Sequence, residues 1–289
     1  MANKEIIAGI SVASDVASLA VVEHGANEIS LLHIDEQRQS SKDEFWFVNV
    51  LLQSSGLAEL RIDQVAIGLD PGTLTVLKCP LDLTLSQPER NEHIHWELSQ
   101  YVENYRPKEQ INDLHVLRTR PQGNTQDVLA VSVRRDTIFG LQENLNRQKL
   151  TLGVVDVNHF AANTALLRSH NEVGRTNCAV IGFNGSRVDV SILNSGHMVD
   201  YQYWVASDGN VAAFLQDGLQ QTSLDTIYLY GTHLRREHQQ TVQSLADVPV
   251  VVIDPFRRLK TAPNVPLSAQ LADRPERFTA AVGIALRKP

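Results

Sequence analysis

Three neighbouring side chains, His93, His95 and Glu97, are of the types that bind metal ions. A zinc site needs ligands that converge on one point. The surrounding segment is typical of a helix, with Ser86 as its N-cap and Glu89 three residues later. Residues two apart on a helix do not share a face. The spacing therefore favours a partly solvated helix over a metal site.

Two groups of basic residues are of a type that contacts anions. The first lies at 233–238 and the second follows Asp254-Pro255-Phe256. Their members are His233, Arg235, Arg236 and His238, then Arg257, Arg258 and Lys260. We favour a charged, solvated surface for both groups. The patterns of a phosphate-binding P-loop, a dinucleotide-binding turn and a nucleophile elbow do not occur.

Composition and charge are those of an ordinary globular protein. The 289 residues are 43% hydrophobic and 20% charged, with a net charge of -7. Such an acidic chain lacks the cationic face that nucleic acids or anionic lipids need. Cys79 and Cys178 show no CxxC spacing, which predicts buried thiols rather than a metal site or a disulfide.

The N-terminal apolar stretch is the one segment that resembles a targeting sequence. Polar residues interrupt it at Ser11, Ser14, Asp15 and Ser18, which predicts a strand hairpin rather than a signal peptide. The sequence also lacks the roughly 18 consecutive apolar residues that predict a membrane span. We therefore expect a cytoplasmic location.

Apolar periodicity predicts an α/β protein in which strand hairpins alternate with helices. Strands are expected at 5–12, 17–24, 29–34, 64–69, 74–80, 115–120, 127–134, 152–157, 177–181, 187–193, 197–204, 226–230 and 248–253. Helices are expected at 43–55, 86–105, 136–148, 159–170, 210–220, 234–245 and 278–287. A three-strand meander begins near Ile6 and again near Ala179, which indicates a duplicated fold with two related lobes.

Five short motifs follow one another along most of the chain. They are IHWELSQYV at 94–102, VDVNHFA at 155–161, VPV at 248–250, DPF at 254–256 and FTAAVGIALR at 278–287. Their order and spacing resemble the type IV pilus assembly protein PilM, a family related to FtsA within the actin-like ATPases. Glu103 stands where that family usually has a proline. The chain resembles a degenerate and shortened member.

The resemblance implies the two-lobed actin-like ATPase fold, a ribonuclease H-like α/β architecture with mixed sheets and a small inserted subdomain. The expected ranges are 1–77 with 150–170 for the first lobe, 78–149 for the insert and 171–289 for the second lobe. Family members commonly carry an extra subdomain beside the adenine. Here only a short connection joins Trp204 to the helix at 210–220, so that subdomain is expected to be reduced or missing.

The resemblance also implies where a nucleotide would bind, in turns that offer backbone N–H groups to the phosphates. The family's aspartate positions hold Ser11 in the first turn and Gly182 in the second, and a family lysine falls at Ser18. The positions that correspond to the nucleotide site are Ser11, Ala13, Ser14, Gly182, Gly185, Ser186 and Gly231. Magnesium prefers oxygen ligands, and neither aspartate remains.

The predicted consequence is weak or absent ATP binding, with no cofactor, no metal and no catalytic residue. One alternative is that Asp15, which is near the first turn and displaced in register, replaces the lost carboxylate. The remaining glycines do not require a ligand, because tight hairpins need positive φ angles in any case. A site without the adenine-side subdomain would be open to water, which weakens phosphate contacts.

The resemblance implies a binding role, because PilM is similar to a cytoplasmic anchor for the N-terminal tail of the inner-membrane protein PilN. We expect a non-catalytic scaffold of a pilus-like machine or, as in the secretion protein GspL, a type II secretion-like machine, peripheral to the inner membrane. Trp96, Tyr101 and Tyr105 are expected to anchor the tail in a groove between first lobe and insert, together with strand edges. Plain core packing is the alternative for Trp96.

Two other functions remain open. An ATP-binding switch of PilM type is disfavoured by Ser11 and Gly182. A kinase of the same fold that acts on a sugar or metabolite is disfavoured further, because no catalytic aspartate can be placed.

Overall fold

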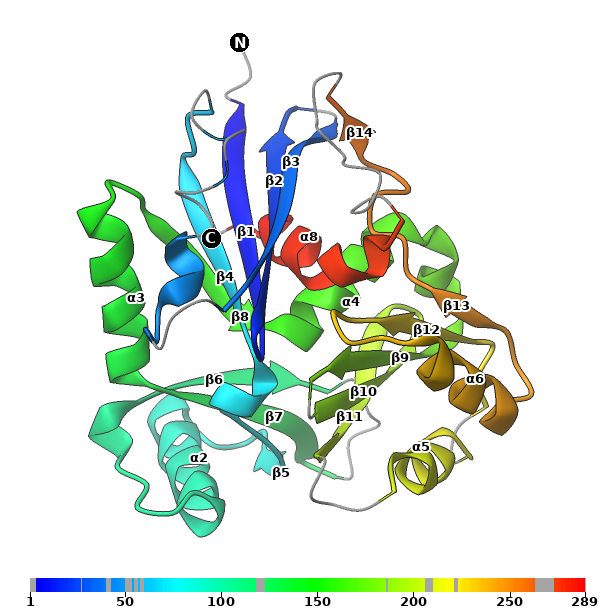
Figure 1. Cartoon of the computed structure of the whole chain (residues 1–289). Helices are drawn as coiled ribbons and strands as arrows, with labels where there is room; N and C mark the ends of the chain where they lie inside the picture. The colour runs from blue at the N-terminus through cyan, green and yellow to red at the C-terminus, as the bar shows by residue number, and fades with distance from the viewer. Residues whose placement is uncertain are drawn as a thin grey trace.

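Three β-sheets organise the computed structural model of the chain (Figure 1). The structure describes residues 4–26, 28–39, 43–49, 54, 57, 60–117, 123–185, 187–205, 210–220, 223–262 and 273–288. Within these ranges two large sheets form the two lobes and a small sheet forms a separate layer beside the first lobe. The mixed sheets and their helices confirm the predicted fold class.

The first sheet has the strand order β14-β3-β2-β1-β4-β8. Its strands are β1 (Glu5–Ala13), β2 (Val16–His24), β3 (Ile29–Arg38), β4 (Gln64–Leu69), β8 (Leu152–Val157) and β14 (Lys260–Thr261). Alternate residues face opposite sides: Ala8 and Ile10 pack toward α3 (Arg135–Arg147) and the 3-10 turn Trp46–Val48. Ile7 packs toward α4 (Asn158–Ser169) and α8 (Thr279–Ala285) on the other side.

The second sheet repeats this plan with the order β11-β10-β9-β12-β13. Its strands are β9 (Asn177–Asn184), β10 (Arg187–Asn194), β11 (His197–Val205), β12 (Thr226–Tyr230) and β13 (Val250–Val252). In both sheets an antiparallel meander is followed by a parallel strand beside its first member, β4 beside β1 and β12 beside β9. This confirms the expected duplication.

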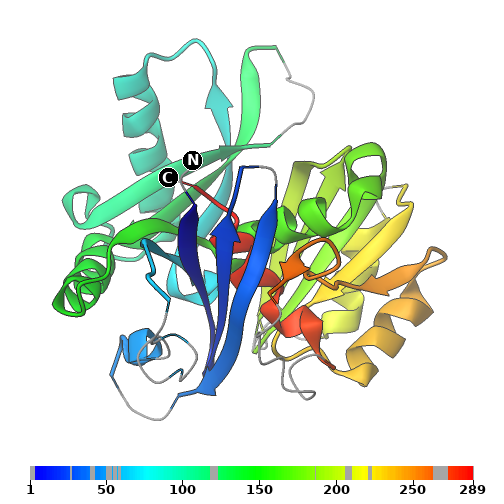
Figure 2. The same cartoon turned by 90° about the horizontal axis from the view of Figure 1, so that it is seen from above.

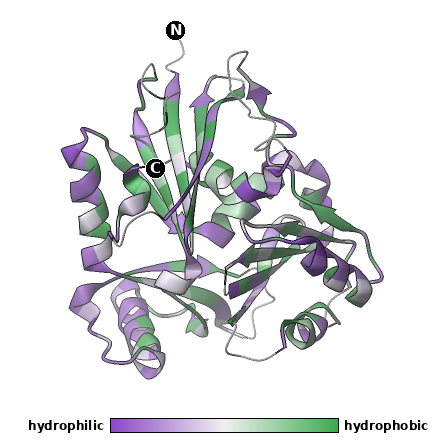
Figure 3. Cartoon of the chain, in the orientation of Figure 1, coloured by the Kyte–Doolittle hydropathy of each residue, from purple (hydrophilic) through white to green (hydrophobic). Residues whose placement is uncertain are grey.

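Helices α5 (Val211–Gln220) and α6 (Arg236–Leu245) cover the outer face of the second sheet. Its inner face packs against α4, which therefore lies between the lobes with α8 (Figure 2). Apolar residues are concentrated along the strands, whereas α3 and α6 are largely hydrophilic on their outer sides (Figure 3). Between β11 and β12 the described residues form α5 alone, in keeping with the expected loss of the adenine-side subdomain.

The small sheet has the order β5-β7-β6, from β5 (Thr75–Asp82), β7 (Thr125–Arg134) and β6 (Gln110–Val116). The 3-10 turn Pro71–Thr73 joins it to β4. Helix α2 (Gln87–Tyr101) covers one face, where Ile94 and Leu98 pack against Val128 and Ala130. The capping box between Ser86 and Glu89 is present as the sequence predicted.

Several expected elements differ in extent from those observed, such as β3, which continues to Arg38 beyond the expected residue 34. Helix α2 ends at Tyr101 instead of 105, and Asn104 adopts a positive φ of 54° that a helix does not allow. Strand β6 begins at Gln110 rather than 115, because its pairing with β7 starts opposite Arg134. Of the helix expected at 43–55, the described residues show the turn Trp46–Val48, and most of the remainder lies outside them.

The contacts also differ from the expected lobe ranges in three places. Helix α3, expected in the insert, contributes Leu141 and Leu145 to the core on the first sheet. Strand β14 and helix α8, expected in the second lobe, join the first: β14 pairs with β3, and α8 packs against β1. A side chain at Gly283 of α8 would collide with the Ala161 carbonyl oxygen of α4, so the two helices touch along their backbones.

Candidate functional site

The turns that the sequence aligned with a nucleotide site lie in contact with one another. Ser14, with φ 56°, forms the β1–β2 turn, and Gly185, with φ 72°, forms the β9–β10 turn. A Cβ atom at Gly185 would lie 2.9 Å from the Ser14 Cβ. The His233 Nε2 atom, from the turn that follows β12, lies 3.4 Å from Asp15 Oδ1. A phosphate chain between these turns would have to push them apart.

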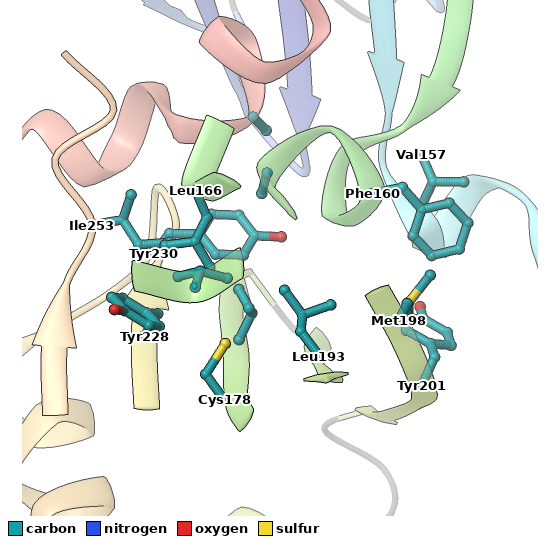
Figure 4. Packing of buried hydrophobic residues seen from close by; sticks show 14 of the residues in the cluster. Val157, Phe160, Leu166, Cys178, Leu193, Met198, Tyr201, Tyr228, Tyr230 and Ile253 are labelled. Carbon is teal, nitrogen blue, oxygen red and sulfur yellow. The ribbon is translucent and has the colours of Figure 1, made fainter. Parts of the chain in front are cut away.

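Tyr230 fills the space beside Gly182, the second aspartate position. A Cβ atom at Gly182 would lie 2.5 Å from the Tyr230 hydroxyl oxygen and 2.6 Å from two ring carbons. Tyr230 is fully buried among side chains packed under α4 (Figure 4), and its hydroxyl lies 2.9 Å from His159 Nδ1. Burial lowers the pKa of His159 to about 3. The substitution to glycine is therefore accommodated by an aromatic side chain, and an aspartate no longer fits.

The remaining first-turn positions also lack a free ligand. Ser11 and Ser18 are paired across β1 and β2, and both are buried, as is Ala13. Asp15, the alternative carboxylate, faces His233. Ser186 lies outside the described residues. The described residues contain no group of three side chains able to hold a metal ion.

A buried carboxylate that the sequence analysis missed stabilises the first turn. Asp70 accepts hydrogen bonds from the backbone N–H of Ser14 and of Gly72, each at 2.8 Å. Burial raises its pKa, and these two hydrogen bonds oppose the shift. The Asp70 carboxylate therefore links the end of β1 to the end of β4.

Arg187 and Asp189 form a buried ion pair that the sequence analysis also missed. Arg187 Nε donates to Asp189 Oδ1 at 2.9 Å, and Nη2 donates to the Tyr201 hydroxyl at 2.6 Å. Nη1 donates to the Pro71 carbonyl oxygen of the first lobe at 2.9 Å. Burial raises the pKa of the Asp189 carboxyl, and the guanidinium opposes that shift. The signal in the sequence that could have revealed this ion pair is the two opposite charges, two positions apart, in a mostly apolar strand.

A groove lies between the first lobe and the small sheet, where the sequence placed it. Its cavity of about 230 Å³ is mostly apolar, with charged residues among its lining. The groove residues are Leu69, Leu74, Ile111, Asp113, His115, Val131, Val133, Ile138, Val155, Asp156, Val157, Phe160 and Arg287. They come mainly from β6, β7 and β8. Strands β6 and β8 are at the edges of their sheets.

The three aromatic residues expected in this groove do not line it. Trp96 and Tyr101 lie on α2, which covers the opposite face of the small sheet, and their side chains are 58% and 69% exposed. Plain core packing of Trp96 is therefore wrong as well. Tyr105 receives a hydrogen bond from Asn112 and lies 2.7 Å from His95 Nδ1. The alternation of β6 and β7 separates the α2 face from the groove face.

The other polar groups weighed in the sequence have local partners. His93 lies 3.6 Å from Glu97, one turn further along α2. Among the described residues no third side chain joins this pair to form a metal site. His238 stacks on Phe183 with ring centroids 4.4 Å apart. Arg257 lies 3.6 Å from Glu172.

Both cysteines are buried, and burial raises the pKa of each thiol to about 12. In the described part of the chain, no helix is long and apolar enough to cross a membrane.

Solved structures with the same fold include two named components of pilus and secretion machines. The chain is similar to a structure of the PilM-PilN type IV pilus biogenesis complex, with 17% identity, 98% of both chains covered and a TM-score of 0.78. It is similar to the cytoplasmic domain of EpsL, an inner-membrane component of the Vibrio cholerae type II secretion system, with 9% identity, 91% and 90% coverage and a TM-score of 0.50.

A third similar structure is a Bacteroides thetaiotaomicron protein with an actin-like ATPase fold and unknown function. It has 15% identity, 87% coverage of this chain and 91% of that chain, and a TM-score of 0.55. Among curated proteins none matches the sequence. The sequence model of the type IV pilus assembly protein PilM family matches residues 15–203, well over half of the chain. The chain therefore belongs to the PilM family and has the actin-like ATPase fold.

Proposed function

We propose that this protein is a nucleotide-independent scaffold that binds an extended tail of a PilN-like inner-membrane protein. The observation that carries the proposal is the groove between β6 and β8, which lies beside a nucleotide site whose three turns touch. The similar structure of a PilM-PilN complex supports a partner of this kind. No catalytic step is assigned, since Ser11 and Gly182 occupy the two aspartate positions and Asp15 faces His233.

The chemistry of the groove suits an extended peptide with apolar side chains. Val131, Val133 and Ile138 give the groove apolar walls, and Asp113, the cross-strand partner of Val131, and Asp156 add carboxylates to its lining. Arg287 forms an ion pair with Asp156. Burial raises the pKa of Asp156, and Arg287 opposes the shift. Apolar contacts would supply most of the affinity, and the charged side chains among them would set the orientation of the peptide.

The edge of β6 offers backbone groups to such a peptide. Leu117 N–H donates to the Asp127 carbonyl oxygen of β7 at 3.1 Å, so the backbone of the even-numbered β6 residues points away from β7. Leu114 N–H is covered by the Asp113 carboxylate at 2.8 Å, which a bound strand would displace. Strand addition gives affinity through the main chain and places alternate side chains on opposite faces.

A second cavity supports this mode of binding. It lies on the α2 side of β6 and is lined by polar residues that include Asn91, His95, Asn112 and Arg135. Ile111 and Asp113 line both cavities, so the edge of β6 runs between them. A peptide strand added there would direct one set of side chains into the apolar groove and the other set toward polar partners.

A bulky charge in the groove should abolish tail binding. Val131→Arg places a guanidinium among apolar side chains, and we expect affinity for a synthetic N-terminal PilN-like tail to fall roughly 30-fold or more. Fluorescence anisotropy with a labelled tail measures the change. Tyr101→Arg, on the exposed face of α2, is the matched control and should bind as wild type. The reverse pattern would move the binding surface to α2 and refute the groove.

Calorimetric titration with ATP and Mg²⁺ tests whether the protein is independent of nucleotide. We expect no binding heat up to millimolar ATP, because the turns must separate and Mg²⁺ finds no paired carboxylates. Clear micromolar binding would contradict a nucleotide-independent scaffold and would favour the ATP switch, with Asp15 as the first residue to substitute.

A further inference from the structure

The contacts between the two lobes differ greatly in burial. The ion pair of Lys78 with Asp200, at 2.7 Å, lies at the surface, where such pairs contribute little. The guanidinium of Arg187 is buried and uses three nitrogens on three acceptors, one of them Pro71 in the other lobe. Its Cζ atom also lies 3.8 Å from the centre of the Tyr203 ring. Arg187 is therefore a buried, charged contact between the lobes, beside the neutral buried hydrogen bonds of α4 with the second sheet, His159 to Tyr230 and Asn163 to Ser191.

The position of Arg187 is significant because it follows the second phosphate turn directly. Here Gly185 touches Ser14, and two residues after Gly185 the guanidinium reaches across to the first lobe. A delocalised, five-donor cation suits this role, since it keeps its charge when buried and donates in fixed directions.

We propose that Arg187 is a positioning residue that holds the two lobes closed in place of a bound nucleotide. Asp189 and Tyr201 orient the guanidinium from the second sheet, and the Pro71 carbonyl oxygen receives its outward N–H. The lobes then stay closed whether or not ATP is present. This closure of the lobes does not depend on a bound partner.

One consequence of the bridge rests on the proposed function. Pro71 belongs to the short connection between β4 and β5. Leu69, just before this connection, and Leu74, just after it, line the groove. Arg187 does not line the groove. By holding Pro71 in place, it also holds the wall of the groove that Leu69 and Leu74 form. Loss of the bridge should therefore weaken tail binding without any change in the groove residues.

Hydrogen–deuterium exchange of the full chain tests the bridge directly. A triple variant, Arg187→Met, Asp189→Ala and Tyr201→Phe, removes the polar network without adding a larger side chain at any of the three positions. Replacing a whole buried pair by apolar residues is often neutral for stability, whereas Arg187→Met alone would leave Asp189 buried and unpaired. Arg187→Lys keeps the positive charge but lacks the planar guanidinium group with its fixed directions of donation. Arg106→Met, which removes an exposed ion pair with Glu109, is the control.

We expect the triple variant to exchange at least about tenfold faster at the Ser14 and Gly185 turns, with Arg187→Lys in between and Arg106→Met unchanged. Mg-ATP should leave wild-type exchange unaltered. A triple variant as protected as wild type, or wild-type turns that become protected only with Mg-ATP, would overturn the proposal. A wild type that binds no tail would refute the proposed function and leave the exchange result standing.

Discussion

Replacement of Gly182 by aspartate should destabilise the protein instead of restoring a magnesium site. The new Cβ atom would lie 2.5 Å from the Tyr230 hydroxyl oxygen, and the carboxylate would be buried beside it. Overpacking and an unpaired buried charge act in the same direction. We expect the free energy of unfolding to fall by roughly 3 kcal/mol or more, measured by urea denaturation followed by circular dichroism.

Gly174→Asp is the matched control for this substitution. Gly174 is exposed, and a Cβ atom there would meet nothing within 4 Å. Its stability should stay within about 0.5 kcal/mol of wild type. Gly182→Ala separates volume from charge, and we expect it to destabilise less than the aspartate. A stable Gly182→Asp protein that binds Mg-ATP would show that Tyr230 can move aside, and our interpretation of the filled site would fail.

Acidification should destabilise the protein through His159. Burial lowers the folded-state pKa of His159 from 6.5 to about 3, with a smaller contribution from Arg187. The unfolded chain therefore binds a proton that the folded chain excludes between these two values. Stability is lost as the pH falls below the unfolded pKa. Between pH 7 and pH 5 this single group should remove about 2 kcal/mol.

His159→Asn isolates this contribution. The amide cannot take up a proton, and it offers a polar group near the position of Nδ1 that faces Tyr230. The variant should be less stable at pH 7, yet lose about 2 kcal/mol less than wild type between pH 7 and pH 5. Burial also lowers the pKa of four other histidines, which both proteins share: His33, His115, His170 and His238. Equal pH dependence in the two proteins would contradict the assignment.

Features that depend on local patterns were predictable from the sequence. The meander near Ile6 and its counterpart near Ala179 follow from alternating apolar residues and short turns, and both were confirmed. The start of α2 was confirmed because Ser86 and Glu89 form a capping box within one turn. The family resemblance added the two-lobed arrangement, which periodicity alone does not specify.

Features that depend on contacts between distant segments were not predictable in the same way. Arg187 meets Pro71 across 116 positions of sequence, and Tyr230 enters the space beside Gly182 from another strand. The aromatic residues of α2 were assigned to the groove because their types suit peptide binding, but the face on which a helix packs depends on the whole small sheet. Helix α2 packs on the face of the small sheet opposite the groove, so Trp96 lies away from it.

The position of α8 in the first lobe has a consequence for the order of events during synthesis. Residues 279–285 are made about 270 residues after the first residues of β1, yet they cover β1, and at Gly283 they leave no room for a side chain against α4. At roughly 5–20 residues per second, the ribosome releases the earliest strand long before its cover exists. Strand β1 must therefore wait for α8 for roughly 14–56 seconds. We expect a nascent chain of this protein to be a substrate for chaperones until α8 emerges.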